Sequence, residues 1–268
     1  MNVLIIAGHG GTPYDSGATG CGQEEAVQTR VMAKLIYDEM RKVDGLRPVL
    51  YDTGKDAYKV LKNGGSLPLS GIEYVIECHL NACVKDTAGD GKTTGVEVLV
   101  HPSEKGITAE QAICRRIAAL GLKNRGVKPN GGLLVMNTVK RHGISHALIE
   151  FCFIDDRDDM NIFMAKREQI AKAVVAGVCE GFGIEYKEDD KVDQKEFEAM
   201  YNKVNPLYKT ISDVPSYWQL EVREMLDSGA INGGTAAAKN PDDVNMRHEA
   251  LQAAIVAYRA AVVNKKEG

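Results

Sequence analysis

The chain begins with an apolar run that ends at a histidine flanked by glycines. Residues 3–7 are Val-Leu-Ile-Ile-Ala, and Gly8-His9-Gly10-Gly11 follow directly. Apolar runs of this length bounded by glycine are typical of a strand buried in a parallel sheet. In open α/β sheets, ligands bind just beyond the carboxyl ends of such strands. The position of His9 therefore indicates a possible site, although a single histidine after a strand is also a common structural residue.

Apolar runs alternate with helical periods along the next part of the chain. We expect strands at 47–51, 74–82, 95–101, 132–136 and 146–154, and helices at 24–41, 57–61, 108–120 and 160–181. Strands that alternate with helices specify layers of helices on both faces of a sheet. The sequence therefore predicts a three-layer α/β domain with a largely parallel mixed sheet.

The composition changes at residues 186–193, Tyr-Lys-Glu-Asp-Asp-Lys-Val-Asp, where apolar side chains almost disappear. A segment of this composition cannot bury enough apolar surface to fold by itself. We therefore expect a large first domain at 1–185, a linker at 186–193 and a small all-α domain at 194–268. The helices expected in that second domain lie at 195–203, 217–228 and 246–263.

Charge and hydropathy exclude several classes of partner. The formal net charge of −4 argues against a nucleic-acid partner, which would call for clustered lysine and arginine. No run approaches the ~20 apolar residues that span a bilayer, and the amino terminus lacks the basic segment of a secretory signal. We expect a protein made in the cytoplasm, with no membrane partner. The six cysteines include no C-x-x-C pair, which favours reduced thiols.

Three polar positions meet at the ends of the predicted strands and loops. They are His9, an acid at Glu24 or Glu25 that opens the first helix, and His79 at the end of the strand 74–82. Two imidazoles and one carboxylate, with a fourth position left for water, form the ligand set of catalytic zinc. The helical phase does not distinguish Glu24 from Glu25.

A further carboxylate lies inside the apolar strand 146–154. Alternation places Ile149, Phe151 and Phe153 on one face, and therefore Glu150 on the other face, together with His146, Leu148 and Cys152. A carboxylate within so apolar a strand needs either a partner or a catalytic role. His146 lies on the same face, where it either supports the site or is a hydrogen-bonded core histidine.

From His9 to Asp159 the chain resembles the zinc-dependent N-acetylmuramoyl-L-alanine amidases of bacterial autolysins and phage endolysins. Four motifs of that family have counterparts here in the same order. They are Gly8-His9-Gly10-Gly11, then Asp15-Ser-Gly17-Ala18-Thr-Gly20 with Glu25, then Glu77-Cys-His79-Leu-Asn81-Ala82, and Leu148-Ile-Glu150-Phe-Cys152-Phe153 with Asp159. The chain departs from the family pattern at Thr12-Pro-Tyr14, which lengthens a loop, at Glu77 in place of serine, and at Cys152 in place of glycine.

The resemblance implies that His9, Glu25 and His79 hold Zn²⁺ and that Glu150 is the catalytic carboxylate. The spacing Gly22-x-x-Glu25 matches the family, which favours Glu25 over Glu24. The implied substrate is peptidoglycan, cut at the amide between the lactyl group of N-acetylmuramic acid and L-alanine. Asn81 is expected to orient His79 or the substrate, or else to cap a loop.

Residues 214–255 resemble the small helical carboxy-terminal module of several phage endolysins, which implies attachment to the bacterial cell wall. A module that only stabilises or dimerises the protein is the alternative, and Trp218 is expected in its core. Two other functions remain open from the sequence. A carboxypeptidase with similar ligands would need an arginine for a terminal carboxylate, and a non-catalytic wall-binding protein would not need Glu150. Without a recognisable signal peptide, a phage endolysin or prophage lysin is the favoured origin.

Overall fold

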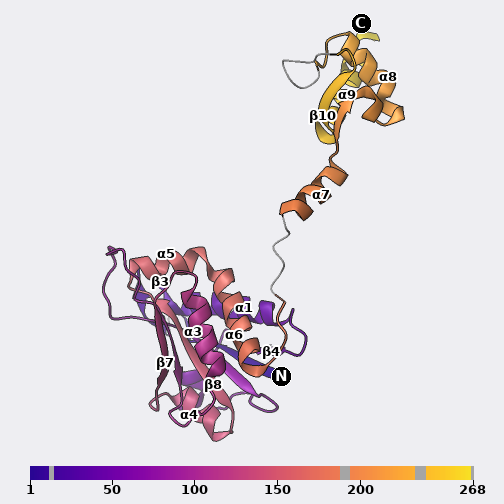
Figure 1. Ribbon diagram of the computed structural model, residues 1–268. Coiled ribbons are helices and arrows are strands. Elements are labelled where there is room, and N and C mark those ends of the chain that lie inside the picture. The colour runs from indigo at the N-terminus through magenta and orange to yellow at the C-terminus, as the bar shows by residue number, and fades with distance from the viewer. Residues whose placement is uncertain (12–14, 188–193, 233–239, 267–268) are drawn as a thin grey trace. The chain divides into compact units, whose positions relative to one another are not determined.

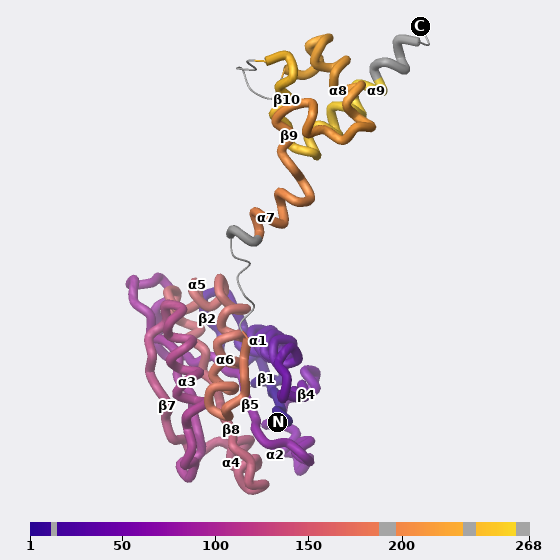
Figure 2. Tube along the Cα trace, turned by 45° about the vertical axis from the view of Figure 1, so that its right-hand side comes forward, coloured from indigo at the N-terminus to yellow at the C-terminus, as the bar shows by residue number. Residues whose placement is uncertain are grey.

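The computed structural model describes residues 1–11, 15–187, 194–232 and 240–266, and Figures 1 and 2 trace the chain. The chain divides into one compact unit at Met1–Glu188 and a second at Asp189–Gly268. The expected loop insertion at 12–14 and residues 188–193 of the expected linker lie outside the described residues. Each unit is treated separately below.

The first unit is built on a six-stranded sheet (Figure 1). Its strands, in spatial order, are β4 (Arg47–Leu50), β1 (Asn2–Ala7), β5 (Tyr74–Asn81), β8 (Ser145–Phe153), β6 (Val96–Val100) and β7 (Asn124–Pro129). Only the pairing of β8 with β6 is antiparallel. The mostly parallel mixed sheet is as the sequence predicts, and it brings the carboxyl ends of β1, β5 and β8 to one edge.

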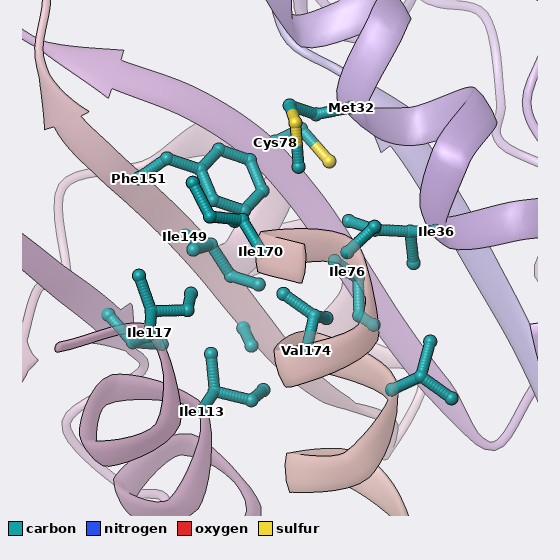
Figure 3. Close-up of a cluster of buried hydrophobic side chains, with 14 of the residues drawn as sticks. Met32, Ile36, Ile76, Cys78, Ile113, Ile117, Ile149, Phe151, Ile170 and Val174 are labelled. Atoms are coloured by element: carbon teal, nitrogen blue, oxygen red, sulfur yellow. The ribbon is translucent and has the colours of Figure 1, made fainter. Parts of the chain in front are cut away.

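One face of the sheet is covered by α1 (Glu25–Met40), α3 (Thr108–Ala118) and α6 (Arg167–Phe182), which lie side by side in Figure 2. Figure 3 shows the core beneath them, where Ile76 and Phe151 of the sheet meet Ile36, Ile113 and Val174 of the helices. The opposite face carries α2 (Ala57–Lys62) and α4 (Leu134–Arg141), over a smaller cluster of sheet residues. Helices on both faces confirm the three-layer architecture.

The apolar run at residues 3–7 follows from this layering. Val3 and Ile5 belong to the core under α1, whereas Leu4 and Ile6 belong to the cluster under α2 and α4. All four side chains are fully buried. Because both faces of the strand are covered, the run is continuous rather than alternating.

The prediction of a strand at 132–136 is wrong, since these residues lead into α4. The buried residues Val135, Met136 and Val139 follow a helical spacing that continues past the apolar run. The strand at this end of the sheet is instead β7, whose sequence Asn-Arg-Gly-Val-Lys-Pro is mostly polar. As an edge strand, β7 needs no continuous apolar run, and Pro129 is tolerated at its end.

The long helix expected at 160–181 is two helices, α5 (Arg157–Ala165) and α6, separated by Lys166. The Asp156 side chain accepts hydrogen bonds from the backbone N–H groups of Asp158 and Asp159, which starts α5 three residues earlier than expected. The first loop holds a further short pair, β2 (Thr19–Gly20) and β3 (Gln23–Glu24).

The second unit contains α7 (Gln194–Val204), β9 (Leu207–Thr210), the 3₁₀ helix η1 (Ile211–Asp213), α8 (Ser216–Asp227), β10 (Asp243–Arg247) and α9 (His248–Lys266). The expected helices are present, but the unit is not all-α, because β9 and β10 pair antiparallel. These strands have four and five residues, too few for an alternating pattern to stand out. Trp218 is buried with Val222 and Leu251, which confirms its expected place in the core.

Within the described ranges, no helix is both long enough and apolar enough to cross a membrane. All six cysteines are free thiols, as the sequence predicts, and four of them are buried.

Candidate metal centre and active site

The end of β1 packs closely against the histidine of β5. The Gly8 N–H donates to the Cys78 carbonyl over 3.0 Å. A Cβ atom on Gly8 would lie 2.4 Å from Cε1 of His79 and 2.7 Å from the Cys78 oxygen, so no side chain fits here. His9 follows with a positive φ of 65°, which turns its imidazole back toward the same edge of the sheet. The local backbone thus requires glycine before the histidine.

Glu25 is the first residue of α1, and its carboxylate lies between the two imidazoles. Its Oε2 lies 3.1 Å from Nε2 of His9, and its Oε1 lies 3.0 Å from Nδ1 of His79. The N–H groups of Ala18 and Leu80 each donate to one of these oxygens. Burial would raise the pKa of Glu25, but hydrogen bonds with His79 and His9 outweigh it and hold the pKa well below its ordinary value. The carboxylate is therefore ionised at neutral pH.

Each imidazole is also held on its far side by a second carboxylate. Nδ1 of His9 lies 3.2 Å from Oδ1 of Asp15, and Nε2 of His79 lies 3.3 Å from Oε1 of Glu77. With a metal ion bound, the nitrogens that face Glu25 would supply the electron pairs, because the carboxylates behind the rings would hold the remaining proton on the opposite nitrogens. One ligand atom from each of His9, Glu25 and His79 lies within 4.8 Å of the other two. This donor set fits a catalytic Zn²⁺ ion that keeps an open position.

Glu24 does not belong to this group, since it lies in the short strand β3 ahead of the helix. The two adjacent acids that helical phase could not separate are thus distinguished by the backbone. Gly17 contributes to this as well, because a Cβ atom there would lie 2.7 Å from both Oε2 of Glu25 and Cδ2 of His9. The glycine of the D-x-G-A motif leaves room for the two side chains to meet.

Glu150 lies on β8, directly opposite His79 of β5 and opposite Glu97 of β6. The residue is partly buried, and its Oε2 atom has no hydrogen-bond partner within the described part of the chain. Burial raises the pKa of this carboxyl to about 7. The carboxyl group therefore gains and loses its proton close to neutral pH.

The expected alternation along β8 holds up to Glu150 and then fails. His79 pairs with Glu150, but Asn81 pairs with Phe153, so β8 carries one extra residue at this point. Cys152 therefore lies in the core with Ile149 and Phe151, and not on the face of Glu150 as predicted. Phe153 correspondingly lies under the guanidinium of Arg125, 4.8 Å from ring centre to Cζ.

The family model described as N-acetylmuramoyl-L-alanine amidase matches residues 3–180, about two thirds of the chain. The chain belongs to this amidase family. It is a zinc-dependent enzyme that acts on peptidoglycan, with a His-Glu-His group at the carboxyl edge of its sheet.

Solved structures agree with the fold of the amidase. The catalytic domain of the CD27L endolysin targeting Clostridia difficile is 28% identical, with a TM-score of 0.55 over 70% of this chain and 99% of that one. An N-acetylmuramoyl-L-alanine amidase from Clostridium difficile 630 is 21% identical, with a TM-score of 0.54 over 68% and 96% of the two chains. A putative amidase of this type from Neisseria meningitidis is 24% identical, with a TM-score of 0.51 over 69% and 97%. The comparison with curated proteins gave no match.

Three polar residues near the site, Glu97, Arg125 and Lys128, belong to none of the four motifs. Glu97 of β6 accepts hydrogen bonds from Asn81, Arg125 and Lys128. Asn81 also accepts from the Ala82 N–H, so among the described contacts it supports Glu97 and a loop rather than His79. Asp159 accepts hydrogen bonds from the N–H groups of Gly95 and Phe153. It therefore links the loop before β6 to the end of β8. Arg125 and Lys128 lie in the polar strand β7, where no sequence motif marks them.

A cavity of about 260 Å³ opens beside the histidines of the amidase. Its polar wall is made by His9, His79 and Glu77, and its apolar wall by Leu148 and residues of α2 and α4. The described lining residues are Ala7, Gly8, His9, Asp15, Asp56, Ala57, Tyr58, Glu77, His79, Leu133, Leu134, Val135 and Leu148. The two histidines among the candidate metal ligands therefore face a space that a substrate can enter.

We expect Gly8→Ala to weaken zinc binding by the amidase about 10–100-fold, the range seen when the support of a metal ligand is disturbed. The new Cβ atom would lie 2.4 Å from the imidazole of His79 and would displace it. Competition with a chromogenic chelator measures the effect. Gly106→Ala is the matched control, because a Cβ atom there meets nothing within 4 Å. Equal zinc affinity in the two variants would contradict the close packing described here.

Proposed function

We propose that His9, Glu25 and His79 are the zinc ligands of this amidase and that Glu150 is its catalytic carboxylate. The ligand assignment is supported by the mutual approach of the three donor atoms within 4.8 Å and by the carboxylates behind both imidazoles. The role of Glu150 is supported by its register opposite His79. The resemblance of the four motifs assigns the same residues independently.

A zinc ion bound by this set would lower the pKa of a water molecule from ~15.7 toward ~7 and polarise the scissile carbonyl. Glu150 takes the proton of the attacking water and delivers it to the amine of L-alanine as the amide bond breaks. A carboxylate with a pKa near 7 suits both steps, because it accepts a proton and releases it at similar cost. Leu148, two residues from Glu150 on β8, contributes to the apolar wall of the cavity.

One observation carries the proposal more than any other. Oε2 of Glu150 is buried and has no partner among the described residues, although buried carboxylate oxygens are normally hydrogen-bonded. An oxygen left without a partner beside a metal-binding group is placed to receive the proton of a water or substrate.

The experiment is mass analysis of purified peptidoglycan after digestion. The expected products are stem peptides with a free L-alanine amino terminus and glycan strands with an intact lactyl group. Fragments cut at a glycosidic bond, or within the stem peptide, would exclude the proposed reaction.

We propose further that the chain is a phage endolysin or prophage lysin. The supporting observation is the likeness of the first unit to the catalytic domain of an endolysin, at 28% identity. Expression together with a membrane-permeabilising protein should then lyse the host, and the Glu150→Gln variant should not. Survival of cells that express the active enzyme would count against a lysin.

We propose that residues 194–268 attach the enzyme to the cell wall, with residues 1–185 as the catalytic domain and 186–193 as the linker. The second unit has its own core around Trp218, so it does not depend on the catalytic core for burial. Tyr217 and Leu220 lie one helical turn apart on α8, and each is more than 70% exposed. These two side chains are the part of α8 that we propose contacts the cell wall.

A chain that stops at residue 186 is expected to keep its zinc and to hydrolyse soluble muropeptides at close to the full rate. The catalytic residues and both core clusters of the first unit lie before this point. Binding to intact cell walls should be weaker, which a sedimentation assay with labelled protein measures. A truncated chain that unfolds would place the boundary elsewhere, and one that binds walls equally well would remove the proposed role of the second unit.

A further inference from the structure

Glu77 lies between two histidines in the interior of the sheet. Its Oε1 atom is 3.3 Å from Nε2 of His79, and its Oε2 atom is 3.0 Å from Nε2 of His146. The Glu77 residue is 6% exposed and the His146 residue 2% exposed. Each oxygen of the carboxylate therefore contacts one imidazole, away from bulk water.

The strand register explains how the three side chains meet. Val75 pairs with His146, Glu77 with Leu148, and His79 with Glu150, so all of these residues point to the same face of the sheet. His146 lies one pair down the ladder from Glu77, a diagonal distance that long side chains can bridge. The other ring nitrogen of His146, Nδ1, has no partner in the described part of the chain. The polar contact of this buried ring is thus made with Glu77.

A carboxylate in this place has two physical effects on His79. In the metal-bound state it would hold the one remaining proton of the imidazole on Nε2 and leave the electron pair on Nδ1, the nitrogen that faces Glu25. It also makes the imidazole a stronger electron donor and fixes the angle of the ring. His146 in turn donates to Glu77, so the carboxylate stays ionised and keeps its orientation when buried.

The two histidines of the metal centre are supported differently. Asp15, behind His9, has a side chain that is 31% exposed and belongs to the first loop. Glu77 lies within the central strand β5 and is fixed on both oxygens. The serine that the family pattern has at this position is too short to bridge both rings, so this support is a feature of the present chain.

We propose that Glu77 and His146 form a buried positioning pair, which sets His79 for the metal and thereby sets the zinc affinity of the enzyme. The proposal rests on the assignment of His79 as a zinc ligand. Neither residue of the pair is proposed to touch the substrate or the reacting atoms. They act through the orientation and donor strength of the His79 imidazole.

The test compares zinc dissociation constants, measured by chelator competition at one pH, with the melting temperatures of the metal-free proteins. Glu77→Ser should weaken zinc binding about 10–100-fold, as expected for loss of a carboxylate behind a metal-bound histidine. His146→Leu should weaken it in the same direction and less. His146→Gln, which keeps a donor in the place of Nε2, should restore affinity close to that of the unaltered protein. The absorption spectrum of the Co²⁺ form should shift in the first two variants and recover in the third.

Glu110→Gln provides the matched control. Glu110 is also a buried carboxylate, and it accepts a hydrogen bond from the Tyr74 hydroxyl, but it does not contact a proposed ligand. Glutamine keeps an acceptor for the Tyr74 hydroxyl, so this variant should leave zinc affinity and the Co²⁺ spectrum unchanged. If Glu77→Ser fails to fold, Glu77→Gln, which nearly keeps the side-chain volume, takes its place and should still weaken zinc binding.

Two results would overturn the pair. One is a Glu77 variant that loses stability but keeps its zinc affinity and Co²⁺ spectrum. The other is an equal loss of affinity from His146→Leu whether or not Glu77 is present, since a residue that acts through Glu77 has no effect without it. His79→Ala separates this failure from that of the ligand assignment. If that variant keeps its zinc, the ligand assignment is wrong, and if it loses zinc while the Glu77 variants do not, only the pair is wrong.

Discussion

Glu150→Gln is expected to give a folded, zinc-loaded protein whose turnover of peptidoglycan is about 10²–10⁴-fold lower, the usual contribution of general acid–base catalysis. Glutamine has nearly the shape of glutamate but cannot take the proton of the attacking water. The measurement is the release of free amino termini from purified peptidoglycan, with zinc content and melting temperature determined on the same preparations. Because the unpartnered Oε2 atom holds no other side chain in the described structure, the fold should not depend on it.

The same variant makes a prediction about stability and pH in the metal-free protein. Burial raises the pKa of Glu150 from 4.5 to about 7, so the folded state favours the protonated form. The contribution of Glu150 to the free energy of unfolding is complete below pH 4.5 and is lost as the pH rises through about 7. At pH 8 the Gln variant should therefore be more stable than the unaltered protein by ~1–3 kcal/mol, and the difference should vanish near pH 4.

A structural role for Glu150 predicts the reverse. If the carboxylate were half of a buried ion pair, its removal would strand the partner and cost ~3–5 kcal/mol, and activity would fall only with folding. A Gln variant that is folded, zinc-loaded and fully active would exclude both roles for Glu150.

Loss of a zinc ligand should have the second large effect. Structural zinc sites bind with about 10–16 kcal/mol through four ligands, which is ~2.5–4 kcal/mol for each ligand, so one lost ligand weakens binding by about 10²–10³-fold. Glu25→Ala and His79→Ala are therefore expected to be purified with little zinc and little activity. Elemental analysis measures the bound metal directly.

Glu24→Ala is the control for the Glu25 variant, since it removes an adjacent acid of the same kind. The structure places the carboxylate of Glu25 between both imidazoles and leaves Glu24 in β3. The control should keep its zinc. Loss of zinc from the Glu24 variant, with retention in the Glu25 variant, would reverse the assignment.

Much of the fold could be predicted because burial on both faces leaves a plain signal in the strands. The run at 3–7 is wholly apolar and that at 146–154 is apolar apart from His146 and Glu150, and the two form β1 and β8 of the sheet. The edge strand β7 is not buried on both faces, so its polar sequence does not predict a strand. The nearby apolar run at 132–136 does predict one, but it leads into a helix. In the second unit, β9 and β10 are too short for their pairing to be read from alternation.

The site was predictable where a motif requires a particular backbone. The positions of Gly8 and Gly17 show why, since each glycine lies where a Cβ atom would strike a candidate metal ligand. Alternation along the sequence does not predict the extra residue in β8 after Glu150, which moves Cys152 into the core. In the sequence, Glu77 is distinguished only in that it replaces the serine of the family pattern. Its contacts with His79 and His146 depend on the register of two strands about 70 residues apart, which the sequence alone does not fix.

The most direct test of the metal centre is anomalous diffraction at the zinc absorption edge, measured from crystals of the full chain grown with zinc. We expect one strong peak per chain, in contact with Nε2 of His9, a carboxylate oxygen of Glu25 and Nδ1 of His79, and with Glu150 facing its open side. A peak bound by Glu24, or by residues away from the carboxyl edge of the sheet, would contradict the account.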